Sequence, residues 1–164
     1  MAVARIAPAY INDLIDILWR GGTWFGYIDN LPSSLYLALL VSEPVQDIYG
    51  YLAYDTAQEV TYTGYARRTI ARSLSGFLGT QGTTAASSGT SGTTRPAADQ
   101  YFPICTTSSQ VVTHTALVTH SQRYETGNDV LCYWELPRPM QLSNSSPGFY
   151  PCLHSAGLTI RIDD

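Results

Sequence analysis

The sequence contains no lysine, and all nine of its basic residues are arginine, against 13 Asp and Glu residues. Charged residues make up only 13% of the 164 positions, about half the ~25% of typical soluble domains. The formal net charge is −4 and no stripe of basic residues is present, so we expect no nucleic-acid partner. Tyr, Ser and Thr hydroxyls must therefore supply much of the surface polarity, and such a surface loses little hydration when another protein covers it.

Long apolar runs are also missing. No stretch reaches the roughly 18 apolar residues of a transmembrane helix, so we expect no membrane span. Residues 1–9 lack the continuous apolar core of a signal peptide and are expected to form an extended arm. An odd set of three cysteines without such a peptide predicts free thiols and synthesis in a reducing cytoplasm.

The familiar signatures of catalysis and metal binding are absent from the sequence. G-x-S-x-G, P-loop, G-x-G-x-x-G, H-x-x-x-H and C-x-x-C patterns do not occur. Glu125, Asp129 and Glu135 fall around one predicted hairpin, where solvated turn and edge charges explain them. His114 is expected at the edge of the core with its ring hydrogen-bonded. We therefore expect no catalytic residue, no cofactor, no metal ion and no enzymatic activity.

The spacing of apolar residues predicts one helix in the chain, over residues 9–20. Ile11, Leu14, Ile15 and Leu18 recur at helical spacing, and Gly21 follows as the stop. Aromatic residues crowd the segments after this helix, and they either plug one end of a β core or contact a neighbouring subunit. The candidate partner-contact residues are Trp19, Trp24, Phe25, Tyr27, Tyr49, Tyr51 and Tyr54.

From residue 35 onward the periodicity is that of strands. Residues 35–41 are apolar on both faces, which predicts a central strand, and residues 45–58 indicate an aromatic loop or hairpin. Residues 111–119 and 130–136 predict a hairpin whose second strand ends at Pro137. We expect one domain spanning residues 1–164, mainly β, with an antiparallel β-sandwich-like architecture, one short N-terminal helix and long loops.

Residues 79–94 are almost entirely Gly, Ser, Thr and Ala, with no charge. Such a segment buries too little apolar area to offset about 1–2 kcal/mol of backbone entropy per residue. The composition therefore predicts a flexible loop, either a tolerated surface insertion or a strap laid across a partner.

Phrases spread along the chain resemble those of small phage virion structural proteins often labelled "phage tail fibre protein". After a short amphipathic helix, they occur in this order: Leu35-Tyr36-Leu37-Ala38-Leu39, Glu59-Val60, Gly64-Tyr65-Ala66-Arg67, Val112-Thr113-His114, Leu136-Pro137-Arg138-Pro139 and Ala156 to Ile160. The chain departs from the family pattern in residues 45–58, 79–94 and 137–152, and these are loops of the kind that carry recognition.

The resemblance implies a virion component made in the host cytoplasm. Because the chain has no coiled-coil heptads or fibrous repeats, the main expectation is a capsid decoration (cement) protein that bridges coat subunits outside an icosahedral head. Its partners would be the phage major capsid protein, or tail proteins, and a second copy of the chain. The alternatives are a tail or tail-fibre-associated structural protein and, from another class, a carbohydrate-binding module that uses its aromatic residues.

Overall fold

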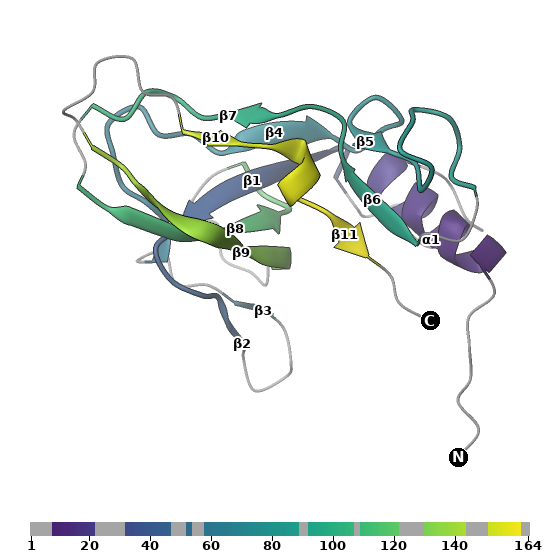
Figure 1. The fold of residues 1–164 in the computed structure, drawn as a ribbon, viewed down its shortest axis with the longest axis horizontal. Helices are drawn as coiled ribbons and strands as arrows, with labels where there is room; N and C mark the ends of the chain where they lie inside the picture. The colour runs from purple at the N-terminus through teal and green to yellow at the C-terminus, as the bar shows by residue number, and fades with distance from the viewer. Residues whose placement is uncertain are drawn as a thin grey trace. The chain divides into compact units, whose positions relative to one another are not determined.

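The protein is described by a computed structural model that covers residues 8–21, 32–46, 52–53, 58–88, 92–106, 109–121, 130–143 and 151–161 (Figure 1). The described part is mainly antiparallel β-structure with one α-helix, which confirms the predicted fold class. The elements are α1 (Pro8–Arg20), β1 (Ser34–Leu40), β2 (Val45–Gln46), β3 (Leu52–Ala53), β4 (Arg68–Ala71), β5 (Phe77–Leu78), β6 (Thr93–Pro96), β7 (Gln100–Tyr101), β8 (Val111–Val118), β9 (Val130–Gln141), β10 (Cys152–Leu153), the 3-10 helix η2 (Ser155–Gly157) and β11 (Ile160–Arg161).

The chain divides into two compact units, each built from segments far apart in the sequence. The helical unit comprises Met1–Ser34, Ile70–Asp99 and Leu153–Asp164, and the sheet unit comprises Leu35–Thr69 and Gln100–Cys152. The single domain expected from the chain length stays a prediction.

The sheet unit is organised around β1, which lies between β4 and β8 in a four-stranded sheet of order β4-β1-β8-β9. Leu37 and Leu39 are fully buried on one face of β1, and Ala38 and Leu40 are fully buried on the other. A strand with apolar side chains on both faces needs cover on both sides, and the sequence predicted this central position. For residues 45–58, expected to form an aromatic loop or hairpin, the described part shows the antiparallel pair β2 and β3.

The β8–β9 hairpin is confirmed, but β9 does not end at Pro137. It continues to Gln141, because the pairing shifts between His114, which faces Glu135, and Val112, which faces Met140. Residues 136–139 therefore oppose Thr113 alone, and the N–H groups that Pro137 and Pro139 lack are not needed by the ladder. Prolines are tolerated here because β9 is the last strand in the sheet order.

Helix α1 confirms the predicted helix of residues 9–20. It ends at Arg20, and Gly21 follows with φ of 74°, a left-handed conformation that glycine adopts without strain. Ile15, Ile17 and Trp19 are all buried, although Ile17 lies off the predicted apolar face. The helix is therefore enclosed on more than one side of its axis.

Arg20, the last residue of α1, ties the helix to the Gly/Ser/Thr-rich segment. Its guanidinium is buried and donates to the carbonyl of Phe77 at 3.1 Å, and to those of Thr84 and Ala85 at 2.9 and 2.5 Å. It also pairs with Asp16 one turn earlier, at 2.5 Å. These bonds connect the helix to residues more than 60 positions away in the sequence.

Other polar side chains of α1 complete this attachment. The Ser87 backbone N–H donates to Asp16 Oδ2 at 2.9 Å, and the Ser87 hydroxyl lies 2.5 Å from Asp16 Oδ1. Thr80 Oγ1 lies 2.9 Å from Asn12 Oδ1. The sequence predicts a loop without fixed partners over residues 79–94, whereas residues 79–88 have them. Polar contacts with the helix take the place of the missing apolar burial.

Asp16→Asn is expected to lower the free energy of unfolding at pH 7 by about 1–3 kcal/mol, because Ser87 and Arg20 lose a charged acceptor. Burial alone would raise the pKa of Asp16, but hydrogen bonds from Ser87 and Arg20 outweigh burial and lower it from 3.8. A lowered pKa gives stability that is present above the unfolded value and is lost as pH falls through the folded one.

Urea unfolding of the wild type and of Asp16→Asn should therefore give free energies that differ at pH 7. The difference should shrink as the pH falls below 3.8 and should disappear below the lower pKa of folded Asp16. The same gap at pH 7 and at pH 3 would contradict the role of the Asp16 carboxylate.

Candidate functional site

A buried carboxylate lies at the centre of the sheet unit. Glu59 is fully buried and forms an isolated bridge with Leu40, the last residue of β1. Its two oxygens accept from Arg67, with Oε1 3.0 Å from Nε and Oε2 2.9 Å from Nη2. The Arg67 Nη1 atom donates to the carbonyl of His120 at 2.7 Å. This bidentate pair therefore fastens residues 59–67 to the end of β1 and to the segment after β8.

Tyr65 completes the network. Its hydroxyl lies 2.7 Å from Glu59 Oε1 and accepts the backbone N–H of Leu39 at 3.0 Å. Burial, together with the negative charge of Glu59, holds the pKa of Tyr65 well above its ordinary value of 10.0. The Tyr65 ring stacks on Phe102 at a centroid distance of 6.3 Å. A neutral tyrosine and a paired carboxylate fix the packing of the unit, and they offer no exposed acid or base to a substrate.

Gly64 allows the chain to turn back toward this network. Its φ of 83° is left-handed, and the Tyr65 N–H donates to the Tyr62 carbonyl at 3.0 Å, which closes a four-residue turn. The structure places this turn between the Glu59 bridge and β4. The two segments Glu59-Val60 and Gly64-Tyr65-Ala66-Arg67 therefore fold together to form one buried polar core.

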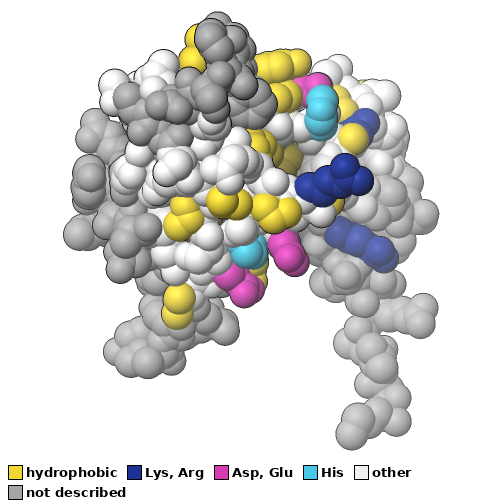
Figure 2. Space-filling model, turned by 60° about the vertical axis from the view of Figure 1, so that its left-hand side comes forward, with side chains coloured by type: hydrophobic (Ala, Val, Ile, Leu, Met, Phe, Trp, Pro, Cys, Tyr) yellow, Lys and Arg dark blue, Asp and Glu magenta, His cyan; other side chains and the backbone are white. Residues whose placement is uncertain are grey.

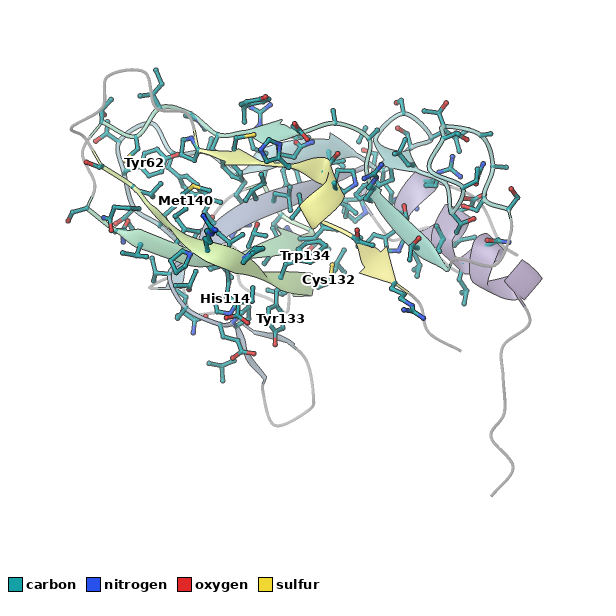
Figure 3. All side chains as sticks on the ribbon, in the orientation of Figure 1. Tyr62, His114, Cys132, Tyr133, Trp134 and Met140 are labelled. Atoms are coloured by element: carbon teal, nitrogen blue, oxygen red, sulfur yellow. The ribbon has the colours of Figure 1, made fainter. Side chains whose placement is uncertain are left out.

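The outer strand β9 carries a half-buried aromatic surface (Figure 3). Tyr133 and His114 lie on one face of the sheet, with ring centroids 6.1 Å apart, and the alternation of β9 places Cys132 and Trp134 on the opposite face. The Tyr133 hydroxyl donates to Glu43 Oε1 at 2.5 Å, and this hydrogen bond raises the tyrosine pKa. Thr113 Oγ1 lies 2.9 Å from His114 Nδ1, which confirms the expected hydrogen-bonded, core-edge histidine.

The β9 surface continues into the irregular pairing at residues 136–139. Pro137, Arg138 and Pro139 are exposed, whereas Leu136 is half-buried. In the space-filling view, hydrophobic side chains on the face shown are scattered among polar atoms (Figure 2). A small mixed surface of this kind is suited to a side-chain contact with another protein rather than to a large apolar interface.

The residues proposed for partner contact are placed only in part. Trp19 is buried, 8% exposed, and its ring packs 6.2 Å from that of Phe77 inside the helical unit. Its indole N–H has no hydrogen-bond partner among the described residues. The other six candidates, Trp24, Phe25, Tyr27, Tyr49, Tyr51 and Tyr54, lie outside the described residues.

Three arginines that lie close in the sequence, Arg67, Arg68 and Arg72, are mostly structural. Arg67 is buried with Glu59, and Arg72 donates to the carbonyls of Pro32 and Ile17 at 3.0 and 2.8 Å. Only Arg68 is exposed. Local composition missed these roles because the partners of Arg72 lie 40 and 55 positions away in the sequence.

Among the remaining titratable residues of the described part, Asp99 and His154 lie side by side. Glu135 is exposed, and Glu125 and Asp129 lie outside the described residues. Asp99 accepts the Ser155 N–H at 2.8 Å and lies 3.0 Å from His154 Nδ1, and these bonds lower the pKa of Asp99 in that order of importance. No helix in the described part is long and apolar enough to cross a membrane.

Glu59→Gln is expected to lower the free energy of unfolding by about 3–5 kcal/mol, because it leaves the Arg67 guanidinium buried without its counter-charge. Glu135→Gln is the matched control, since Glu135 is exposed on β9 and should change stability by less than about 0.5 kcal/mol. Urea or thermal unfolding of the three proteins measures both effects. A loss for Glu59→Gln no larger than that for the control would exclude a structural role for the pair.

Burial raises the pKa of the Cys132 thiol to about 12, so the reactive thiolate is scarce at neutral pH. Iodoacetamide at pH 8 should therefore alkylate Cys132 at least about a hundredfold more slowly in the folded protein than in urea. Peptide mass spectrometry follows the reaction, and the rate in urea serves as the control. Similar rates in both conditions would show that the thiol is accessible and ionised.

The family model described as "Podophage GP4 fiber I protein gp80" matches residues 8–147, which is most of the chain and includes both the Glu59–Arg67 pair and β9. No curated protein matches the sequence. The resemblance to phage tail fibre proteins is thereby confirmed, and the chain belongs to the Podophage GP4 fiber I protein gp80 family as a structural protein of the phage virion.

Proposed function

We propose that this chain is a structural component of the phage tail fibre apparatus and that it acts by contact with other virion proteins. The observation that carries the proposal is the family match over residues 8–147, because the family is one of phage fibre proteins. The match favours the tail-fibre alternative over capsid decoration, which the sequence put first. The absence of fibrous repeats, which favoured the capsid, fits a small module attached to a fibre equally well.

Two features of the sheet unit support a role in contact. The carboxylate of Glu59 and the hydroxyl of Tyr65 are enclosed by hydrogen bonds, so their chemistry is used to hold the fold. The outer strand β9 carries half-buried Tyr133 on one face and half-buried Leu136 on the other, and exposed Arg138 follows. We assign contact with a neighbouring fibre or tail protein, or with a second copy, to this surface. We propose no enzymatic activity for the chain.

The manner of contact follows from the chemistry of β9. An edge strand with free N–H groups can add a strand from a partner, but proline has no N–H to donate. Pro137 and Pro139 therefore block strand addition over the C-terminal part of β9. A partner would instead meet the side chains of the strand, with Arg138 available for a carboxylate of that partner.

The location of the chain in the virion tests this proposal. Antibody against the chain should label the tail fibres in electron micrographs of intact particles, and protein gels of separated heads and tails should place it with the tails. The major capsid protein serves as the marker for heads. Abundant copies on heads would overturn the fibre role in favour of capsid decoration, and absence from both fractions would overturn both.

A further inference from the structure

Three side chains that carry metal-binding atoms converge beside the paired strands β7 and β10 (Figure 1). They are Asp99, Cys152 and His154, and their ligand atoms all lie within 4.8 Å of one another. Asp99 directly precedes β7, Cys152 is the first residue of β10, and His154 follows that strand. Among the described residues, this is the one group of three such side chains that lie so close together.

The extended chain of β10 sets the spacing of the cysteine and the histidine. His154 has φ of −70° and ψ of 131°, so the chain stays extended past the end of the strand. Side chains two residues apart on an extended chain leave the same face, and buried Leu153 points to the opposite one. The boundary between the two units falls between Cys152 and Leu153, inside this strand. The spacing of thiol and imidazole is therefore a property of β10 itself.

Hydrogen bonds within the helical unit orient the carboxylate of Asp99. Its Oδ1 atom accepts the Ser155 backbone N–H at 2.8 Å, and its Oδ2 atom lies 3.0 Å from His154 Nδ1. Bonds of this kind hold carboxylate ligands in place around metal ions. With Zn–N and Zn–O bonds of about 2.0–2.2 Å, neighbouring ligand atoms in a tetrahedral site lie roughly 3.3–3.5 Å apart. The Asp99–His154 pair therefore needs only a small change to share one ion.

The cluster is open to an ion in solution. The side chain of His154 is 77% exposed and that of Asp99 is 35% exposed, and Cys152 is half-buried. Thiolate and imidazole ligands favour Zn²⁺, whereas Ca²⁺ and Mg²⁺ take oxygen ligands. One thiolate and one carboxylate together balance the two charges of the ion. The thiol loses its proton as the metal binds, as cysteine ligands of zinc do.

We propose that Asp99, Cys152 and His154 bind a Zn²⁺ ion in a tetrahedral site whose fourth position is taken by water. The ion would link Asp99 to a segment 55 positions later in the sequence and thereby stabilise the folded chain. From the sequence we expect no metal ion, because H-x-x-x-H and C-x-x-C patterns are absent. The proposed ligands come from two distant segments, which such patterns do not detect. The proposal goes beyond the fibre role and does not depend on it.

Titration of the full chain with Co²⁺ tests the site, because Co²⁺ replaces Zn²⁺ in tetrahedral sites and is coloured. The chain is first stripped of metal with a chelator and kept reduced with a phosphine. We expect visible d–d bands and a near-ultraviolet thiolate charge-transfer band, both saturating at a single ion per chain and both removed by Zn²⁺. Zn²⁺ at a hundredfold excess over its Kd should also raise Tm by about 5 °C or more.

Variants of the ligands and matched controls locate the ion. Cys152→Ser should remove the charge-transfer band, and both Cys152→Ser and His154→Asn should weaken Zn²⁺ binding at least about tenfold. Cys132→Ala and His120→Asn change a cysteine and an exposed histidine outside the cluster, and they should bind Co²⁺ as the wild type does. Circular dichroism identifies the variants that are folded, and His154→Asn alters an exposed side chain that the fold tolerates.

Several outcomes would overturn the site. One is the absence of a charge-transfer band at about 1 mM Co²⁺, and another is a band that persists in folded Cys152→Ser. Octahedral Co²⁺ bands without a thiolate contribution would show only adventitious binding to exposed carboxylates and histidines. A band without any rise in Tm would show that the unfolded chain binds the ion equally well, so that the fold does not build the site. None of these results bears on the fibre role, which the location in the virion tests separately.

Discussion

Each unit of the molecule depends on the enclosure of guanidinium groups among carboxylates and carbonyls. Arg67 and Glu59 are almost completely withdrawn from water, and an unpaired charge in such a place would cost several kcal/mol. The planar fork of arginine donates to several acceptors at once, which the compact ammonium of lysine does less well. Arg20 uses this property to hold three backbone carbonyls and Asp16 together. The absence of lysine therefore fits this fold, because each buried cation has to donate hydrogen bonds to several acceptors at once.

This internal use of charge leaves a surface rich in hydroxyls. Arg20, Arg67 and Arg72 bind within the structure, so fewer charges remain for the exterior of a chain that is only 13% charged. Such a surface can be covered by neighbouring proteins with a small loss of hydration.

Local signals in the sequence predicted much of the fold. The periodicity of residues 9–20 gave helix α1, and the apolar run at 35–41 gave the central strand β1. The hydrogen bonds of residues 79–88 were not predicted. The composition of this segment shows that it has few apolar side chains, but it carries no information about Arg20, which binds it from more than 60 positions away. The continuation of β9 past Pro137 was missed for a related reason, since the pairing shift that tolerates proline is a property of two strands.

Hydrogen bonds to polar side chains hold residues 79–88 in place, although this segment has almost no apolar side chains. Amide hydrogen exchange of the intact protein, followed residue by residue by NMR, tests this claim most directly. The Ser87 N–H, bound to Asp16 Oδ2, and the Ser88 N–H, bound to Thr80 Oγ1, should be strongly protected and should exchange as slowly as hydrogen-bonded amides inside a stable helix or strand. Exchange of both amides at the rate of an unstructured peptide would contradict the account, because the segment would then be free of the helix.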